Sequence, residues 1–183
     1  FKSTNKKIIF VMSNFQTNGR GRLGNRWISN NGNIFFTLKI FPSRDLVSYH
    51  ELGILTCLEI KKTIETLNIN NVFLKWPNDI YIKNKKVGGV LIEAYKNNNN
   101  TFCLIGVGIN FVSSPGPNKY NATFLKKYNK LIEREIFIKI LLKNLIFNYN
   151  KWDKNKKFEF IKNYKKSLMY INKNVIIKIN YQN

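Results

Sequence analysis

Acidic residues, histidine and cysteine are all scarce in this chain of 183 residues, which carries 10 Asp and Glu, 1 His and 2 Cys. The single histidine, His50, argues against a histidine-based metal site or catalytic triad. Cys57 and Cys103 lie in apolar stretches without CxxC spacing, so neither a disulfide framework nor a zinc site is predicted. No apolar run approaches the ~20 residues that span a bilayer, and no signal-peptide pattern opens the chain. The composition therefore predicts a soluble, cytoplasmic protein without a membrane partner.

Positive charge, by contrast, is abundant, because 31 Lys and Arg give a formal net charge of +21. A strongly basic chain is a candidate for nucleic-acid binding. These lysines, however, are spread along the chain and accompany many Asn and Ile residues, a pattern typical of an AT-rich coding sequence. Arginine is distributed differently: three of the five arginines, Arg20, Arg22 and Arg26, fall within seven residues. Guanidinium groups form forked contacts to phosphate or carboxylate, so this cluster predicts an anion site.

The hydrophobic pattern predicts one folded domain, since 44% of the residues are hydrophobic. Short apolar runs bounded by turn residues predict strands, and apolar residues at helical spacing predict helices. The order of these elements predicts an α+β fold, with a mixed, mostly antiparallel sheet packed against helices. The predicted strands are residues 7–12, 34–41, 72–76, 80–82, 87–95, 102–109 and 175–179, and the predicted helices are residues 46–67, 133–149 and 156–164.

The arginine cluster lies in a glycine-rich loop, residues 19–27, which ends on Trp27. Gly19, Gly21 and Gly24 allow positive φ angles and a close approach of the backbone to a ligand. The loop is neither a Walker motif nor a dinucleotide fingerprint, because it lacks the GK[ST] ending and no helix pattern follows it. Alone it fits an anion-binding loop, an RNA-binding Arg/Gly loop or a surface turn.

Three further motifs combine glycine or proline with polar side chains at strand ends. In the first, Pro77 stops a strand and displays Asn78 and Asp79, which suits either a metal-bound phosphate oxygen or a simple turn. In the second, a lysine precedes two glycines inside a strand, where glycine is unfavourable unless something must approach the backbone. The third is a glycine-containing strand that ends on an amide side chain. The motifs are residues 75–79, Lys86 with Gly88 and Gly89, and residues 106–110.

Together with Gln16, the four motifs in this order resemble the catalytic domain of biotin protein ligases, over about residues 7–180. The resemblance implies the fold of the biotin and lipoate ligases, which is like that of class II aminoacyl-tRNA synthetases. It implies a catalytic domain at residues 1–170, with residues 171–183 as the first strand of a truncated, small barrel-like C-terminal domain. It also implies a reaction in two steps: biotin and ATP form biotinyl-5′-AMP, and a lysine of a biotin carrier protein then takes the biotinyl group.

The resemblance assigns a role to each motif. Lys86 and Arg22 would be the catalytic cations, and Asp79 would help to hold Mg²⁺ with the ATP phosphates. Physically, cations are required because the biotin carboxylate and the α-phosphate are both negative. The biotin-binding set is Gln16, Arg20, Gly21, Arg22, Trp27, Lys86, Gly88 and Gly89, and the nucleotide-binding set is Trp76, Asn78, Asp79 and Asn110.

Some features depart from the family pattern. The family has a Ser-Thr-Asn motif that opens a helix well before the glutamine, but only ten residues separate Asn5 of Ser3-Thr4-Asn5 from Gln16. Ser3 and Thr4 are therefore not expected to fill the family role. Asn25 stands where many members have a basic residue. No helix-turn-helix pattern precedes the domain, so DNA is not an expected partner.

The sequence alone leaves other functions open. The expected partner is the biotin carrier domain of a carboxylase, and edge strands could pair two copies in a homodimer. The alternatives are a lipoate ligase or octanoyltransferase of the same fold, a basic RNA-binding protein, and a ligase that has lost activity.

Overall fold

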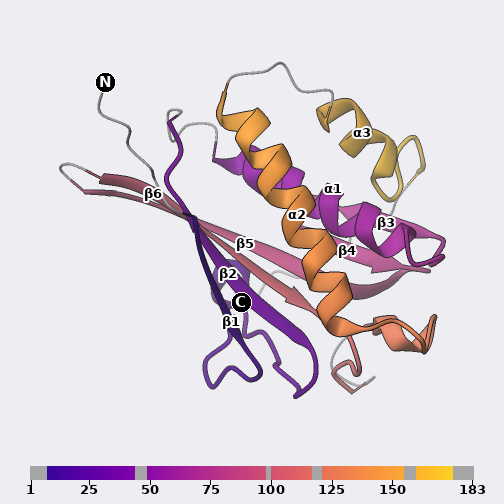
Figure 1. Ribbon diagram of the computed structural model, residues 1–183. Helices are drawn as coiled ribbons and strands as arrows, with labels where there is room; N and C mark the ends of the chain where they lie inside the picture. Colours follow the sequence, from indigo (N-terminus) through magenta and orange to yellow (C-terminus); the bar gives the residue numbers. More distant parts are fainter. Residues whose placement is uncertain (1–7, 44–48, 98–99, 117–120, 155–159, 175–183) are drawn as a thin grey trace, which may run out of the picture.

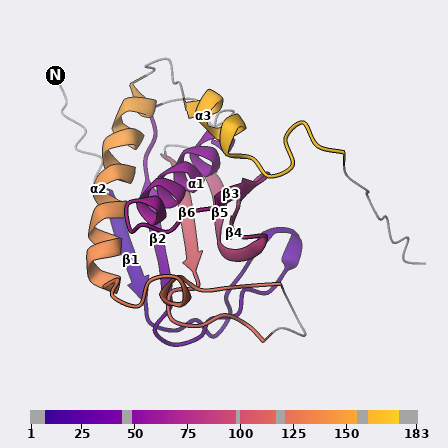
Figure 2. The same cartoon turned by 90° about the vertical axis from the view of Figure 1, so that its right-hand side faces the viewer.

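A six-stranded sheet forms the centre of the computed structural model, which describes residues 8–43, 49–97, 100–116, 121–154 and 160–174. Helices cover one face of this sheet, and the loop between the first two strands crosses below it (Figures 1 and 2). The strands are β1 (Ile9–Ser13), β2 (Ile34–Ile40), β3 (Val72–Lys75), β4 (Asp79–Ile82), β5 (Lys85–Asn97) and β6 (Asn100–Ile109); the helices are α1 (His50–Glu65), α2 (Arg134–Asp153) and α3 (Phe160–Ser167), with short 3-10 turns at Arg22–Gly24 and Leu125–Lys127.

The strand order is β1-β2-β6-β5-β4-β3, and every pair of neighbouring strands is antiparallel. The predicted α+β architecture is confirmed, although parallel pairing is limited, within the described residues, to isolated bridges such as Leu74 with Leu168. Strands β5 and β6 form a long hairpin that inserts between β2 and β4. This placement brings the second, third and fourth sequence motifs onto neighbouring strands.

The core lies between the sheet and the helices. In strand β2, Ile34, Phe36 and Leu38 are buried in this core, whereas Thr37 and Lys39 are more accessible. Helix α1 packs on this face and buries ten of its sixteen residues. A fully buried aliphatic side chain contributes about 1.5–3 kcal/mol to stability. The opposite face of the sheet carries glycines, polar residues and the buried Phe35, which pairs with Gly108, and the loop of residues 14–33 lies on this face.

Asn33 holds the sheet together at the end where β2 begins and β6 ends. Its side chain is fully buried, and its Oδ1 accepts hydrogen bonds from the backbone N–H groups of Phe111, Val112 and Ser113, at 2.9, 2.9 and 3.2 Å. Its Nδ2 donates to the carbonyl oxygen of Ser113 at 2.9 Å. One amide thus satisfies four backbone groups and joins the start of β2 to the segment that follows β6.

Several sequence predictions fall on residues that are not described. One of them is the first turn of the helix predicted at residues 46–67. Helix α1 begins at His50 and ends at Glu65. The motif Ser3-Thr4-Asn5 and the strand predicted at residues 175–179, with the truncated barrel domain, also lie outside the described residues. Among the helices of the described part, none is long and apolar enough to span a membrane.

Candidate active site

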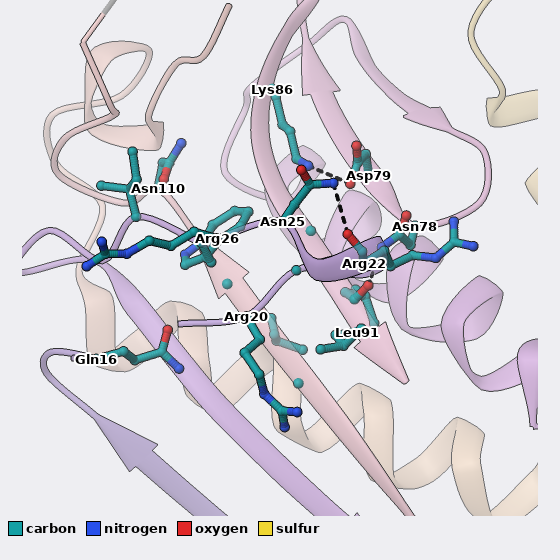
Figure 3. Close-up of a pocket in the computed structure, with 18 of the residues that line it drawn as sticks. Gln16, Arg20, Arg22, Asn25, Arg26, Asn78, Asp79, Lys86, Leu91 and Asn110 are labelled. Carbon is teal, nitrogen blue, oxygen red and sulfur yellow. Dashed lines mark hydrogen bonds and ion pairs between the residues drawn. The ribbon is translucent and has the colours of Figure 1, made fainter. Parts of the chain in front are cut away.

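A cavity of about 400 Å³ opens on the face of the sheet that the helices leave free. Its floor is formed by β5 and β6, and the arginine loop, residues 19–27, lies over it (Figure 3). Nearly all the residues singled out from the sequence line this cavity, although they come from three separate stretches of chain. They are Gln16, Arg20, Gly21, Arg22, Trp27, Asn78, Asp79, Lys86, Gly89 and Asn110.

The arginine loop is a tight turn closed by its own backbone. The N–H of Gly21 donates to the Asn25 carbonyl at 2.7 Å, and the N–H of Trp27 donates to the Gly19 carbonyl at 2.9 Å. Of the three glycines expected to need conformational freedom, only Gly24 has a positive φ, of 74°. Gly19 is required for a different reason, because a Cβ there would stand 2.6 Å from the Trp27 carbonyl oxygen. The side chains of Arg20, Arg22 and Arg26 are exposed.

Trp27 lies flat against the sheet. A Cβ at Gly108 would come within 2.6 Å of the indole, and one at Gly89 within 3.4 Å. Gly89 and Gly108 are direct cross-strand partners, so two adjacent strands both lack a side chain beneath the ring. These strand glycines therefore provide the space for Trp27, and the indole forms one wall of the cavity.

An ion pair stands at one end of the cavity: Lys86 Nζ lies 2.7 Å from Asp79 Oδ1. Asp79 opens β4 and Lys86 is near the start of β5, so the hairpin between these strands brings the two charges together. The Asn78 side chain donates to the Val90 carbonyl, and the Val90 N–H donates to the Asn78 carbonyl at 2.9 Å. The Asn-Asp pair is thus held rigidly against β5, beside a lysine that is only 31% exposed.

Elsewhere in the cavity, the side chains of Gln16, Asn110 and Trp27 have polar atoms without a hydrogen-bond partner in the described part of the chain. Ser29 Oγ donates to Gln16 Oε1 at 2.9 Å, which leaves the Gln16 amide N–H groups for a ligand. Asn110 Nδ2 donates to the Thr123 carbonyl at 3.1 Å. Within the described residues, Asn110 Oδ1 and Trp27 Nε1 are buried without a partner. Buried polar atoms are normally paired, so these two are candidates for ligand contacts.

Two residues predicted for the site do not reach the cavity. Trp76, assigned from the sequence to the nucleotide-binding set, is 71% exposed, directly follows the edge strand β3 and does not line the cavity in this structure. Gly88 is buried on the helix-covered side, and a Cβ there would meet the Gly108 carbonyl oxygen and Ile109. The reason is a bulge in the pairing of β4 with β5, which reverses the facing of Gly88 and Gly89.

The motifs also missed residues of the cavity. Leu91 and Glu93 line it, two and four positions beyond Gly89 on β5. Side chains alternate along a strand, so Gly89, Leu91 and Glu93 share one face. Once Gly89 is placed on the cavity side, this alternation identifies the other two. Glu93 forms an ion pair with Arg20, with Nη2 and Oε2 3.0 Å apart.

Neither cysteine is a candidate nucleophile. Burial raises the pKa of the Cys57 thiol, and the Asp79 carboxylate raises it further, while Lys86 acts in the opposite direction. Burial raises the pKa of Cys103 to about 11. Both thiols are buried and unpaired. A protonated, inaccessible thiol does not attack a substrate, so the chemistry of this cavity belongs to its cations and amides.

The site suits magnesium only together with phosphate. Across the described part of the chain, no three His, Cys, Asp or Glu side chains cluster as a ready-made metal site. Asp79 supplies one carboxylate oxygen that is not the atom paired with Lys86, and Asn78 lies next to it. Mg²⁺ is commonly held by one or two carboxylates plus substrate phosphates. The donor set therefore fits a phosphate-bound Mg²⁺.

Comparison with known proteins identifies the family. The model of the biotin/lipoate A/B protein ligase family matches residues 1–110, more than half of the chain. The chain belongs to this family. The matched range contains the arginine loop, the Asn78-Asp79 turn, Lys86 and strand β6 with the Asn110 that follows it.

Several relatives of this family member are named biotin–protein ligases. The biotin–protein ligase of Homo sapiens is 31% identical over 143 residues, covering 74% of this chain and 20% of that protein. The bifunctional ligase/repressor BirA of Bacillus subtilis is 34% identical over 107 residues, covering 57% of this chain and 33% of that protein. The chain thus spans between a fifth and a third of the length of these two relatives.

Solved structures of the family have the same fold. The biotin protein ligase from Aquifex aeolicus, in complex with biotin and ATP, aligns with a TM-score of 0.77 at 30% identity. The alignment covers 88% of this chain and 69% of that one. The sheet and helices of this family member therefore follow the architecture of a structure that holds both small molecules.

Proposed function

We propose that this chain is the catalytic part of a biotin protein ligase, which activates biotin with ATP and transfers it to a lysine of a carrier protein. The observation that carries the proposal is the Lys86–Asp79 ion pair, which lies in one cavity with the arginine loop and the amide of Gln16. The Aquifex aeolicus relative, whose structure contains biotin and ATP, supports this choice of substrates.

The cavity has two chemically distinct ends, which suits a ligand with a neutral head and an anionic tail. Gln16 and Arg20 lie at the opposite end from Lys86 and Asp79 (Figure 3). The free N–H groups of Gln16 would hold the ureido ring of biotin, and Trp27 and Leu91 would contact its apolar body. The carboxylate would then point towards Lys86.

Two anions must meet for adenylation, the biotin carboxylate and the α-phosphate of ATP. Lys86 and Arg22 would offset their repulsion and stabilise the charge that develops on the phosphorus oxygens. No protein nucleophile is required, because the carboxylate itself attacks and pyrophosphate leaves. Asn78, Asp79 and Asn110 would bind the nucleotide, and Mg²⁺ held by Asp79 and the phosphates would supply further positive charge there.

The acceptor in this proposal is a lysine on the biotin carrier domain of a carboxylase. The residues that carry the chemistry lie within 1–170, which we propose as the catalytic domain. We place the reaction in the cytoplasm, because two buried, unpaired cysteines suit a reducing compartment that also supplies ATP. The proposal includes a homodimer formed through strand edges and does not include DNA as a partner.

The lipoate ligases belong to the same family, so the two substrates need a direct comparison. Pyrophosphate release would be measured with ATP and Mg²⁺ in the presence of biotin or of lipoate. We expect release with biotin and little with lipoate, since the lipoyl ring lacks ureido groups to pair with Gln16. Release with lipoate alone would replace the proposal by a lipoate ligase, and salt-sensitive RNA binding without any release would support the nucleic-acid alternative.

A further inference from the structure

Glu93 is a carboxylate of the cavity that the proposed reaction does not use. It lies on β5 seven residues beyond Lys86, about 23 Å along the strand at the usual rise of 3.3 Å per residue. Its Oε2 lies 3.0 Å from Arg20 Nη2, and its side chain is 26% exposed. An unpaired carboxylate in a cavity for anionic substrates would repel them, so the pairing with Arg20 removes that repulsion.

The second oxygen of Glu93 is also held. The Tyr95 hydroxyl donates to Oε1 across 3.4 Å. Tyr95 stacks on its cross-strand partner Phe102, with ring centres 5.0 Å apart, and the Lys39 ammonium lies 4.1 Å from the centre of the Phe102 ring. The Glu93 side chain is therefore fixed by neighbours on its own strand and the next one, before it contacts Arg20.

Arg20 connects the two arms of the arginine loop. It forms an isolated bridge with Arg26, and the loop between them is closed by the Gly21–Asn25 hydrogen bond. Holding Arg20 therefore holds both arms of the turn that carries Arg22. Among the interactions of the described residues, Arg20–Glu93 is the one ion pair that joins this loop to the sheet.

We propose that Glu93 is a positioning residue, which anchors the arginine loop over the biotin end of the cavity through Arg20. It would contact the loop and not the substrate. The inference rests on the proposed function for its effect on biotin, but the anchoring contact itself can be tested without any substrate. Exposed ion pairs contribute little, so we expect an effect of about twofold to fivefold.

The test compares Glu93→Gln, which keeps the shape and removes the charge, with Glu65→Gln. Glu65 forms a comparable exposed ion pair with Lys61 on α1, outside the cavity, and so is the matched control. Trypsin cleavage after Arg22 and Arg26, followed by mass spectrometry of the folded protein, reports how often the loop opens. We expect cleavage to be about twofold to fivefold faster in Glu93→Gln and unchanged in Glu65→Gln.

Two further measurements separate positioning from a general structural effect. In the ligase assay, Glu93→Gln should raise the KM for biotin by about twofold to fivefold, with kcat within about twofold and the KM for ATP unchanged. Combining Glu93→Gln with Arg20→Gln should accelerate cleavage no more than Arg20→Gln alone, because both remove one contact.

Each outcome bears on the proposal in a defined way. Equal cleavage of Glu93→Gln and Glu65→Gln, or additive effects in the double variant, would overturn the anchor. If Glu93→Gln is cleaved faster but the wild-type protein releases no pyrophosphate with biotin, the anchor is supported and the ligase function is overturned. If the wild type is active and Glu93→Gln has the same KM for biotin, the link between the anchor and biotin binding is overturned.

Discussion

The indole of Trp27 occupies the space in which a side chain at position 108 would stand. A Cβ built on Gly108 lies 2.6 Å from indole Cε2 and 2.8 Å from Cζ2, far inside van der Waals contact. The loop residue and the strand residue are 81 positions apart in the sequence, and the indole can lie here because position 108 has no side chain. The wall of the cavity therefore depends on a missing side chain in β6.

Gly108→Ala should displace Trp27 from the sheet. The new methyl group cannot share the space with the ring, and a loop residue can move more easily than the central strand. We expect tryptophan emission to shift to the red and biotin-dependent pyrophosphate release to fall. Gly106→Ala is the control for the emission shift, because its Cβ would have only ordinary contacts, the nearest at 3.5 Å. Similar emission spectra for the two variants would contradict this arrangement.

Lys86→Ala should lower biotin-dependent pyrophosphate release by about 100-fold or more, the usual effect of removing a group that stabilises transition-state charge. The neighbouring Lys85 is exposed and does not line the cavity, so Lys85→Ala should retain nearly full activity. Steady-state kinetics of both variants would measure the difference. Equal losses would assign the effect to the general positive charge of this turn instead of to Lys86.

Asn33→Ala should destabilise the fold, because three backbone N–H groups lose their acceptor in a largely buried place. We expect the free energy of unfolding in urea to fall by about 2–4 kcal/mol. Asn33→Asp keeps an acceptor oxygen and should cost less. The exposed neighbour Asn31 is the control, and Asn31→Ala should stay within about 0.5 kcal/mol of the wild type. A stability loss for Asn31→Ala as large as that for Asn33→Ala would argue against the clamp.

Stability should decline in alkaline solution. Burial raises the pKa of two thiols and three phenols, that of Cys103 from 9.0 to about 11. The folded protein thus keeps protons that the unfolded chain releases from about pH 9 upwards, and the free energy of unfolding falls there by up to about 1.4 kcal/mol per pH unit for each group. The groups are Cys57, Cys103, Tyr81, Tyr149 and Tyr164.

Urea unfolding at pH 8 and pH 10 would measure this decline. Tyr164→Phe removes one titrating hydroxyl and should make the dependence on pH shallower, although it also loses the hydrogen bond to the Pro77 carbonyl. Stability that stays constant or rises between the two pH values would show that these groups are not protected by the fold.

Local signals were sufficient for the elements of the fold. The apolar run that Pro42 ends predicted β2, and Lys83-Asn84, both with positive φ, form the turn between the two strands predicted at residues 80–82 and 87–95. Strand and turn patterns act over a few residues, so they can be recognised without tertiary structure. The arginine loop was recognised in the same way, from its unusual concentration of arginine and glycine.

The facing of residues on β5 could not be predicted in that way. Regular alternation would place Lys86 and Gly88 on one face of the strand. The pairing shifts between Ile80 and Tyr81, so that Ile80 faces Gly88 while Tyr81 faces Lys86 and Val87 is the extra residue. Lys86 and Gly89 therefore share the cavity side, and Gly88 turns to the other face.

The sequence by itself determined which segments form strands and helices, and which short motifs carry polar chemistry, because these depend on neighbouring residues. Only the tertiary structure decided that Trp27 lies over Gly108, that Arg20 pairs with Glu93, and that Trp76 stays outside the cavity. These outcomes depend on strand order and register. Both are set by packing the whole sheet against its helices, where a shift of one residue reverses the face on which every later side chain lies.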